Sequence, residues 1–565
     1  MPHHHHEGKK FENFVFNILK TPSKKVFVII AVIIALVGSI MMLPTKAVMA
    51  RMLPGKSANT FNVYVTTPAG SSIEETKAVS QCVVDQLTKE KEITDIETFL
   101  AQGAPLDYAG LVKGSALKQG ERFAEIVVNL TDKHEREEKS FTMVHRLRPE
   151  IKKECGNIIK ETTISFIEMP SGPPTLAAIA VEVYGDKNSD VLKVANDVAH
   201  ILKKTPKLVD VDIMSETPYD RYQLIPLKDK IAKSGLTVEQ VNNILYLAFK
   251  GMEVAVKNTI EINDQVGIFV SLSRDSKKLS NSTLNALSAK LSSLYLMNKK
   301  GMMVPLTEIV DIVKIKSTPT IYHKDLKTMV NVIAETDMES QVYPLLEARQ
   351  TMIEYFGEHG YEVSKVPGIT TFMFDLNLKD KQTGKEYLIR WDGEMKVTLD
   401  TFRDLGAAFI AALILIYLLL VIYYKSFAIS GIVLAGSFLS IIGVIVGHWV
   451  ADLVTVDVFF LTATSLIGFI ALMGISSRNS LLLIDFAKSL MEEKGIEKRR
   501  AIAIASATRA KPIMLTAIAI ILGSALLASD PIFGGLGVAL ISGTVAAVIV
   551  SLIFIPVLMD NTKAL

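Results

Sequence analysis

The long apolar run from Leu461 to Leu490 carries a charged residue, Arg478, near its middle. Holding a charge at that depth in lipid costs about 3 kcal/mol on insertion scales, so such an arginine normally faces a carboxylate or a water-filled path. If Lys488 marks the membrane rim, about 1.5 Å of rise per residue places the Arg478 guanidinium roughly 15 Å deep, near mid-bilayer. The run therefore predicts a membrane-spanning helix that contains a functional site.

Helical periodicity gathers the charges of this run on one side. At about 100° per residue, one face carries two small residues and both charges: Ala471, Gly474, Arg478 and Asp485. Small residues let a second helix approach closely. Two alternatives stay open: the charges face a neighbouring helix, or Arg478 and Asp485 neutralise each other within their own helix.

Six segments are long and apolar enough to cross a membrane: Val26–Leu43, Leu405–Tyr424, Phe427–Val450, Leu461–Leu490, Ile513–Ala528 and Val538–Met559. Lysines precede the first segment, and lysines and arginines follow the fourth, whereas the loops HWVADLVTVD and ASDPIFGG have neither. The positive-inside rule then predicts that both termini are cytoplasmic. No small-residue cleavage site follows the first segment, so we expect it to stay as an anchor.

Composition narrows the function classes. Lys+Arg number 61 against 59 Asp+Glu, so no basic footprint indicates nucleic acid. Hydrophobic residues make up 49% of the 565, which is typical of a membrane protein with large aqueous domains. No Walker loop, HExxH, GxSxG or paired catalytic His/Cys/Ser signature occurs, so we expect neither an enzyme nor a cofactor. His3–His6 are a tag, a metal-binding tail or a solvated run, and composition does not decide.

The stretch between the first and second segments, about 44 to 404, is too long for a loop and predicts a folded body. Its first part has the β-α-β-β-α-β order of a ferredoxin-like unit, from FNVYVTTPAG to TTISFIEM. The order begins again at AIAVEVYG and continues through RYQLIPL and TVEQVNNILYLAFKG, and it closes only after an insertion of about 251–318. The predicted fold class is an α+β membrane protein: six transmembrane helices and two ferredoxin-like modules, one with an insertion.

Cys82 and Cys155 are the only cysteines, and both lie on predicted helices of the first module. An extracytoplasmic location permits a disulfide. Pairing and free thiols both stay open.

Several motifs occur in a fixed order: MLPGKSANTFNVYVTTPAGSSIEET, LMGISSRNSLLLIDFAKSL, ATRAKPIMLTAIAIILG and DPIFGGLGVALISGTVAAVIVSLIFIPVL. Together they resemble the second half of a resistance-nodulation-division (RND) transporter, from its seventh to its twelfth transmembrane helix, over nearly the whole chain. The resemblance implies a cytoplasmic segment at 1–25, a first span at 26–43, a first porter subdomain with linker at 44–174, a second at 175–250 and 319–400, a docking subdomain at 251–318, and five helices at 401–565.

By this resemblance, the chain is part of a proton-driven exporter in the bacterial inner membrane. Such pumps are trimers that join a periplasmic adaptor and an outer-membrane channel, and substrate passes the cleft between the porter subdomains. The family commonly has a lysine at the position of Arg478, and because arginine does not release its proton, Arg478 would act as a counter-charge. The family's proton-binding aspartates lie on its fourth transmembrane helix. We therefore expect a separate first-half subunit to supply them, alongside membrane lipids as neighbours.

Three other residues are candidates for the proton relay. Asp485 lies near Lys488 and the headgroups, where a carboxylate is already hydrated. Thr516 either joins the relay or bonds the carbonyl four residues back. Asn479 either supports Arg478 or forms an ordinary hydrogen bond between helices.

The substrate is a small molecule or a metal ion. Soft side chains occur in the porter region, at Met143, His145, Cys155, Met169 and Met214. Thioethers and thiolates suit Cu(I)-like cations, although most methionines fill cores. Met169 lies closest to the position of a cleft methionine in metal-exporting members. Aromatic residues are only 7%, with no phenylalanine cluster in the first module to favour organic compounds.

Two other functions stay open. One is a non-transporting membrane scaffold or sensor that keeps the RND fold. The other is a homo-oligomer that transports alone and uses Asp485.

Overall fold

The computed structural model describes residues 4–53, 55, 57–115, 118–169, 172, 175–263, 265–279, 283–366, 374–455 and 459–564. The chain forms two compact units. The first consists of Met1–Ser215 and Ile321–Leu565, and the second is Glu216–Thr320.

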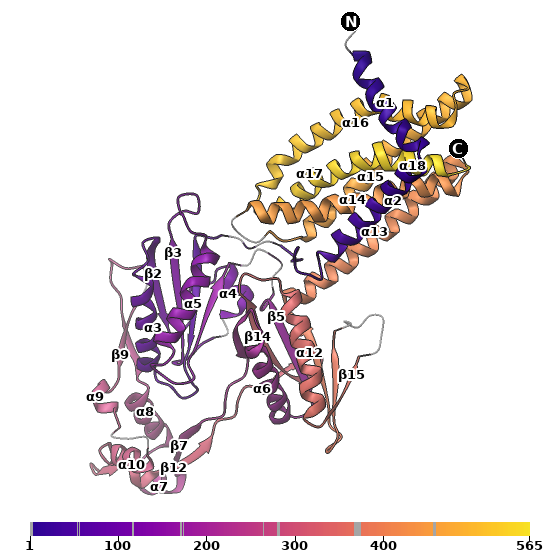
Figure 1. Cartoon of the computed structure of the whole chain (residues 1–565). Coiled ribbons are helices and arrows are strands. Elements are labelled where there is room, and N and C mark those ends of the chain that lie inside the picture. Colours follow the sequence, from indigo (N-terminus) through magenta and orange to yellow (C-terminus); the bar gives the residue numbers. More distant parts are fainter. Residues whose placement is uncertain are drawn as a thin grey trace. The chain divides into compact units, whose positions relative to one another are not determined.

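Six helices of the first unit are long and apolar enough to cross a membrane, as the sequence predicts: α2 (Pro22–Met41), α13 (Glu394–Tyr424), α14 (Phe427–Val454), α15 (Ala463–Lys494), α16 (Lys498–Ala528) and the final span Gly534–Asn561. The final span comprises α17 (Gly534–Ile549), a π-helical turn (Val550–Phe554) and α18 (Ile555–Asn561). About half of the apolar stretch is buried in α14, α15 and the final span, against 6% in α2 and α13 and 17% in α16. Most of the apolar stretch of α2, α13 and α16 is therefore exposed. Figure 1 shows these helices in one bundle with α14, α15 and α17.

The N-terminal segment contains a further helix, α1 (His4–Lys20), that the sequence analysis did not predict. Val15, Ile18 and Leu19 of this helix are buried against the transmembrane bundle. Glu12 forms an ion pair of 2.6 Å with Arg500 at the start of α16. His3 and the side chains of His4–His6 lie outside the described part of the chain.

The first aqueous module has the predicted β-α-β-β-α-β order. It comprises β1 (Thr60–Thr66), α3 (Ile73–Leu87), β2 (Ile93–Leu100), the additional short α4 (Tyr108–Lys113), β3 (Phe123–Leu130), α5 (Ser140–Cys155) and β4 (Thr163–Glu168). Its strands are antiparallel in the order β2-β3-β1-β4. One face of the sheet packs on α3 and α5 through a core that includes Val63, Val83, Ile126 and Ile151.

A capping box begins α3, and a disulfide joins α3 to α5. Ser72 and Glu75 form a capping box at the start of α3, in which each side chain bonds the other residue's backbone N–H. A disulfide joins Cys82 on α3 to Cys155 on α5, with the two Cα atoms 5.7 Å apart.

The second module is built on a longer antiparallel sheet. Its elements are β5 (Ile179–Gly185), α6 (Asn188–Lys204), β6 (Leu208–Ile213), β13 (Tyr322–Lys324), β14 (Lys327–Thr336), α12 (Val342–Glu358), β15 (Tyr361–Lys365), β16 (Leu376–Asp380) and β17 (Glu386–Asp392). The strand order is β13-β14-β5-β17-β16-β15. Because β5 occupies one edge of β14, β6 and β13 share the other edge. The chain between Ser215 and Ile321 is thus inserted into one edge of this sheet.

The second unit begins earlier than the expected insertion. The predicted strand RYQLIPL is β7 (Asp220–Pro226), and it pairs with β12 (Val310–Lys316) and not with the strands of the second module. The predicted helix TVEQVNNILYLAFKG is α8 (Val238–Phe249), which buries Val241 and Leu245 in the core of this unit. Both elements exist as predicted, but the division of the structure assigns residues 216–250 to the second unit.

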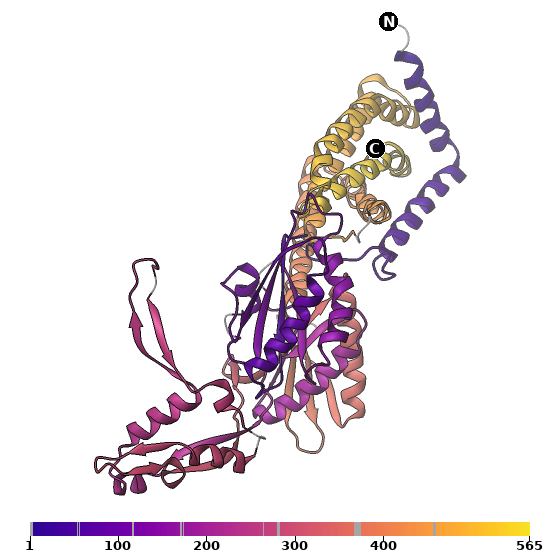
Figure 2. The same ribbon diagram turned by 90° about the vertical axis from the view of Figure 1, so that its left-hand side faces the viewer.

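The second unit also contains α7 (Lys228–Lys233), β8 (Met252–Lys257), β9 (Val266–Val270), α9 (Arg274–Lys277), α10 (Leu284–Ser292), β10 (Tyr295–Met297), β11 (Met303–Pro305) and α11 (Leu306–Ile309). Strands β8 and β9 form an exposed hairpin, the long pair of pink strands in Figure 2.

Candidate functional site

Arg478 lies on an open face of α15. This helix begins at a capping box between Thr462 and Ser465 and ends at Gly495, which adopts the left-handed conformation favourable to glycine. Its exposed residues recur every three or four positions: Ile467, Ala471, Gly474, Arg478 and Leu482. Within the described part of the chain, no atom of another element lies within 4 Å of a Cβ built at Gly474. This face has room for a second helix to pack closely.

Arg478 makes no hydrogen bond or ion pair with any residue that the structure describes. The intrahelical pairing with Asp485 is therefore not present. A guanidinium at this depth without a counter-charge is unfavourable in lipid. The geometry of α15 thus requires an acidic or hydrated neighbour on this face.

Asp485 is held by another helix. The Tyr424 hydroxyl at the end of α13 donates a hydrogen bond of 2.7 Å to Oδ1 of Asp485. Tyr424 is itself buried. Asp485 is half-buried and contributes to the contact between α13 and α15, so its carboxylate is paired with Tyr424 and not with Arg478.

Asn479 lies about 100° around the helix from Arg478, on the buried side, and only 4% of its surface is exposed. On the same buried side, α14 and α15 meet through small polar residues. Ser477 and Ser437 share a hydrogen bond of 2.6 Å, and Ser476 donates to the Gly436 carbonyl at 3.1 Å. Short side chains let the helices approach closely, and hydrogen bonds between them stabilise the contact.

Thr516 on α16 has a local partner. Its hydroxyl donates a hydrogen bond of 2.9 Å to the carbonyl of Pro512, four residues earlier. This is the helix back-bond that the sequence left open as an alternative to a relay. Among the residues that the structure describes, no hydrogen bond or ion pair joins any two of the four relay candidates.

The soft side chains of the aqueous modules are dispersed. Met143 is fully buried in the core between sheet and helices, and Cys155 is in the disulfide, so it offers no thiolate. Met169 packs against a separate group on the other face of the first sheet, and Met214 follows β6 with its N–H bonded to the Asn331 carbonyl. His145 contacts Asp337. In the described ranges, no group of three or more His, Cys, Asp or Glu could hold a metal.

The surroundings of Met169 form a buried polar site that the sequence analysis missed. Tyr64, Phe123 and Ile167 line it, and the Lys118 ammonium lies 4.7 Å from the centre of the Tyr64 ring and 5.6 Å from that of Phe123. A cation over two aromatic faces is attracted by their quadrupoles. Burial nevertheless lowers the pKa of Lys118, because it disfavours the charged amine.

Glu125 lies on β3, beside this group. Its carboxylate accepts hydrogen bonds of 2.7 Å from both the Asn62 side chain and the Ala104 N–H. Burial raises the pKa of Glu125 above its ordinary value, although these bonds oppose the shift. Strand alternation alone would have placed these residues on the face away from the helices, but only the tertiary structure shows the segment that covers them.

Comparison with known proteins now identifies the family. The model of the AcrB/AcrD/AcrF family matches residues 4–354 and 371–560, which is nearly the whole chain. The chain belongs to this family. AcrB/AcrD/AcrF proteins are RND efflux transporters, and the family's relatives include multidrug and heavy-metal pumps.

Individual relatives of this AcrB/AcrD/AcrF chain are distant. Swarming motility protein SwrC of Bacillus subtilis (strain 168) is 23% identical over 543 residues, covering 94% of this chain and 45% of SwrC. Multidrug export protein AcrF of Escherichia coli (strain K12) is 22% identical over 566 residues, covering 98% of this chain and 49% of AcrF. The chain thus spans about half the length of these relatives.

The same proportion holds for a solved structure. The crystal structure of a heavy metal efflux pump (crystal form II) superposes with a TM-score of 0.72 at 17% identity, over 99% of this chain and 52% of that one. This likeness shows the RND fold over the full length of the chain.

Proposed function

We propose that this chain is the half-subunit of a proton-driven RND efflux pump, corresponding to the seventh to twelfth transmembrane helices. The observation that carries this proposal is Arg478 on the open face of α15, where it has no partner among the residues that the structure describes. A first-half polypeptide with six spans and two adjacent intramembrane carboxylates would cover this face and neutralise the charge.

In this proposal, Arg478 is a fixed counter-charge and the partner's carboxylates carry the proton. Arginine keeps its proton at any physiological pH, so it stabilises a neighbouring carboxylate and does not shuttle. Both termini lie in the cytoplasm and the two modules in the periplasm, because the basic loops mark the cytoplasmic side. The complete pump is a trimer that works with a periplasmic adaptor and an outer-membrane channel.

Among substrates, the surroundings of Met169 count against a soft metal ion. A soft metal requires several thioether or thiolate ligands. Here Met169 has aromatic neighbours, Met143 is in the other core, and Cys155 is in a disulfide. A Met169→Leu variant of the complete pump should therefore leave copper and silver tolerance unchanged. Loss of metal tolerance in that variant would favour a metal exporter.

The main test is co-expression with such a first-half polypeptide. We expect a stable complex that confers export, whereas this chain alone should aggregate or associate nonspecifically. A tight, active assembly of this chain without any partner would contradict the proposal.

The same experiment separates the other two functions. Export by the chain alone that is lost in Asp485→Asn would indicate a homo-oligomer. A stable complex without export of any compound, although all subunits are present, would indicate a scaffold or sensor.

A further inference from the structure

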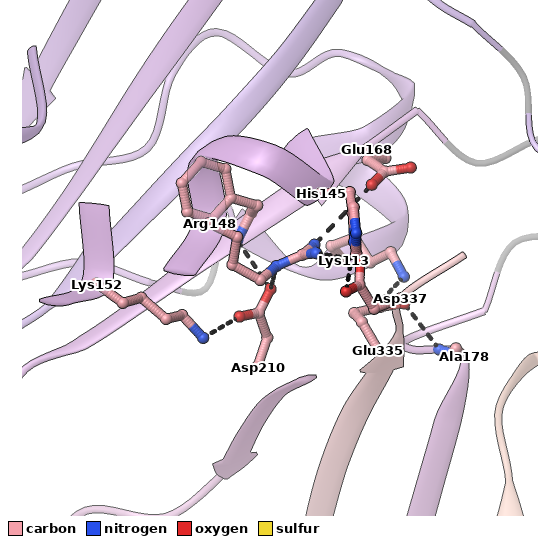
Figure 3. A network of polar contacts seen from close by, with 10 residues as sticks. Lys113, His145, Arg148, Lys152, Glu168, Ala178, Asp210, Glu335 and Asp337 are labelled. Atoms are coloured by element: carbon pink, nitrogen blue, oxygen red, sulfur yellow. Dashed lines mark hydrogen bonds and ion pairs between the residues drawn. The ribbon is translucent and has the colours of Figure 1, made fainter. Parts of the chain in front are cut away.

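The two aqueous modules meet along a seam of ion pairs between bases of the first module and acids of the second (Figure 3). Three bases lie on one face of α5 in the first module, at His145, Arg148 and Lys152. Their acidic partners, Asp210 and Asp337, come from the second module. The i, i+3, i+7 spacing explains why one helix presents all three bases to the same neighbour.

Asp210 is the centre of this seam. Its carboxylate accepts hydrogen bonds from the Phe166 N–H of β4 at 3.0 Å and from Nε of Arg148 at 3.3 Å, and it also contacts the Lys152 ammonium. Its side chain is 1% exposed. The three donors belong to the first module and the acceptor to the second, so this one carboxylate joins the edges of two separate sheets.

The backbone at Asp210 is unusual in a way that fits this role. Between Val209 and Asp212, β6 contains one residue more than the facing stretch of β14, which is a β-bulge. Asp210 has a φ of 53°, in the left-handed region that favours glycine. A bulge re-aims a side chain, and here it points a carboxylate out of the sheet toward Phe166 and Arg148. Glycine would relieve the backbone but would remove the carboxylate.

Arg148 is the matching residue of the first module. Its side chain is 5% exposed and reaches three carboxylates: Nη1 lies 2.9 Å from Asp337, Nη2 lies 3.9 Å from Glu168, and Nε bonds Asp210. A second contact between the modules lies beside it, where Lys113 on α4 forms an ion pair of 2.6 Å with Glu335 of β14.

The energetic cost of losing one partner of these ion pairs depends on how deeply the pair is buried. Removing one partner of a buried ion pair leaves an uncompensated charge, which costs far more than loss of an exposed pair. Replacing either Arg148 or Asp210 would therefore leave the other charge buried without its partner. The exposed contact between His145 and Asp337 has no such penalty, because 47% of the His145 side chain is open to solvent.

We propose that Arg148 and Asp210 are positioning residues that form a permanent joint between the two modules, so that any relative movement is a rotation about this joint. The joint itself follows from the contacts. Its part in transport rests on the proposed export function, in which substrate passes between these modules.

The test measures the distance between the modules in the full chain. Spin labels are placed on exposed residues of each module, at Lys77 on α3 and Asn196 on α6, after substitution by cysteine. The native cysteines are in the disulfide and do not take the label. We expect a narrow distance distribution in the otherwise unaltered chain and a clearly broadened one in both Arg148→Met and Asp210→Gly, because Asp210→Gly keeps the left-handed backbone and removes only the carboxylate.

Arg146→Met is the matched control. Arg146 lies on the same helix, but its partners Glu90 and Glu138 both belong to the first module. It should leave the distribution narrow, and Arg148→Lys should broaden it only partly. Equal distance distributions in Arg148→Met, Asp210→Gly and Arg146→Met would show that Arg148 and Asp210 do not form a joint between the modules.

Export in cells that also carry the partner half separates the two claims. With broadened distances, we expect at least a tenfold loss of export in Arg148→Met and Asp210→Gly and none in Arg146→Met. Broadened distance distributions with full export would support the joint but would contradict passage of substrate between the modules.

Discussion

At the scale of single residues, Arg478 is the side chain whose surroundings make the sharpest prediction. Arg478→Met keeps approximate length and apolarity but removes the charge. A partner carboxylate would then lose its counter-ion, hold its proton and fail to release it near neutral pH. We expect export to be abolished. Membrane abundance should be retained, because removing the charge also removes the free-energy cost of inserting it into lipid.

Two further variants show whether the loss of export is due to loss of the positive charge. Arg478→Lys should keep partial export, because it preserves the charge and loses the forked geometry. Leu482→Ala, on the same exposed face of α15, should export normally. Both transport and the membrane abundance of each variant are measured in cells with the partner half. Normal export by Arg478→Met would show that Arg478 does not act as a counter-ion.

Glu125 gives a prediction about pH. Because burial raises the pKa of Glu125 above its ordinary 4.5, the folded module binds this proton more tightly than the unfolded chain does. The contribution of Glu125 to the free energy of unfolding is therefore present at low pH and decreases as pH rises from 4.5 through the raised pKa. As pH rises over that range, the free energy of unfolding of the unaltered chain should fall relative to that of Glu125→Gln. Thermal unfolding between pH 4 and 8 measures it, and a pH-independent difference would contradict the assignment.

At the scale of elements, the disulfide between α3 and α5 constrains the first module. It closes a loop of 73 residues, and chain-entropy arguments give about 4 kcal/mol for a loop of that size. We expect a Cys82→Ser, Cys155→Ser double variant to unfold at a clearly lower temperature than the oxidised chain. A reductant should reproduce the shift in the unaltered protein but not in the variant. Equal unfolding temperatures with and without reductant would show that the bond does not stabilise the module.

At the scale of the whole molecule, the strand order predicts that the second unit can be removed. Ile213 at the end of β6 faces Val332, and Tyr322 at the start of β13 faces Met329, on the same edge of β14. Three residues of strand span about 10 Å, so a short Gly/Ser linker can join these ends. Replacing Glu216–Thr320 by that linker should leave the second module folded, because its sheet takes no strand from this unit.

Protease resistance and helix content of the shortened chain test this expectation. The control is removal of β14 instead, the strand that lies between β5 and β6, which should destroy the sheet. Rapid proteolysis of the shortened chain, at the rate of the control, would show that the second module depends on the excised unit.

Sequence alone determined the features that depend on neighbours a few residues away. The six spans follow from continuous hydropathy, the start of α3 from the Ser72 and Glu75 capping box, and the open face around Gly474 and Arg478 from the helical period. The strand-helix order of the first module follows from alternation of apolar and polar residues. Each of these is a local pattern, and local patterns survive any arrangement of the rest of the chain.

Only the tertiary structure decided which distant segments meet. The strand RYQLIPL was predictable, but its partner β12 lies far along the chain, so pairing assigned it to the second unit. Asp485 took Tyr424 of another helix as its partner, and not Arg478 of its own. The bulge at Asp210 could not be located from the sequence, because its carboxylate is held by Phe166 and Arg148, which belong to a distant part of the chain. Such contacts depend on the free energy of long-range packing, which no window of neighbouring residues contains.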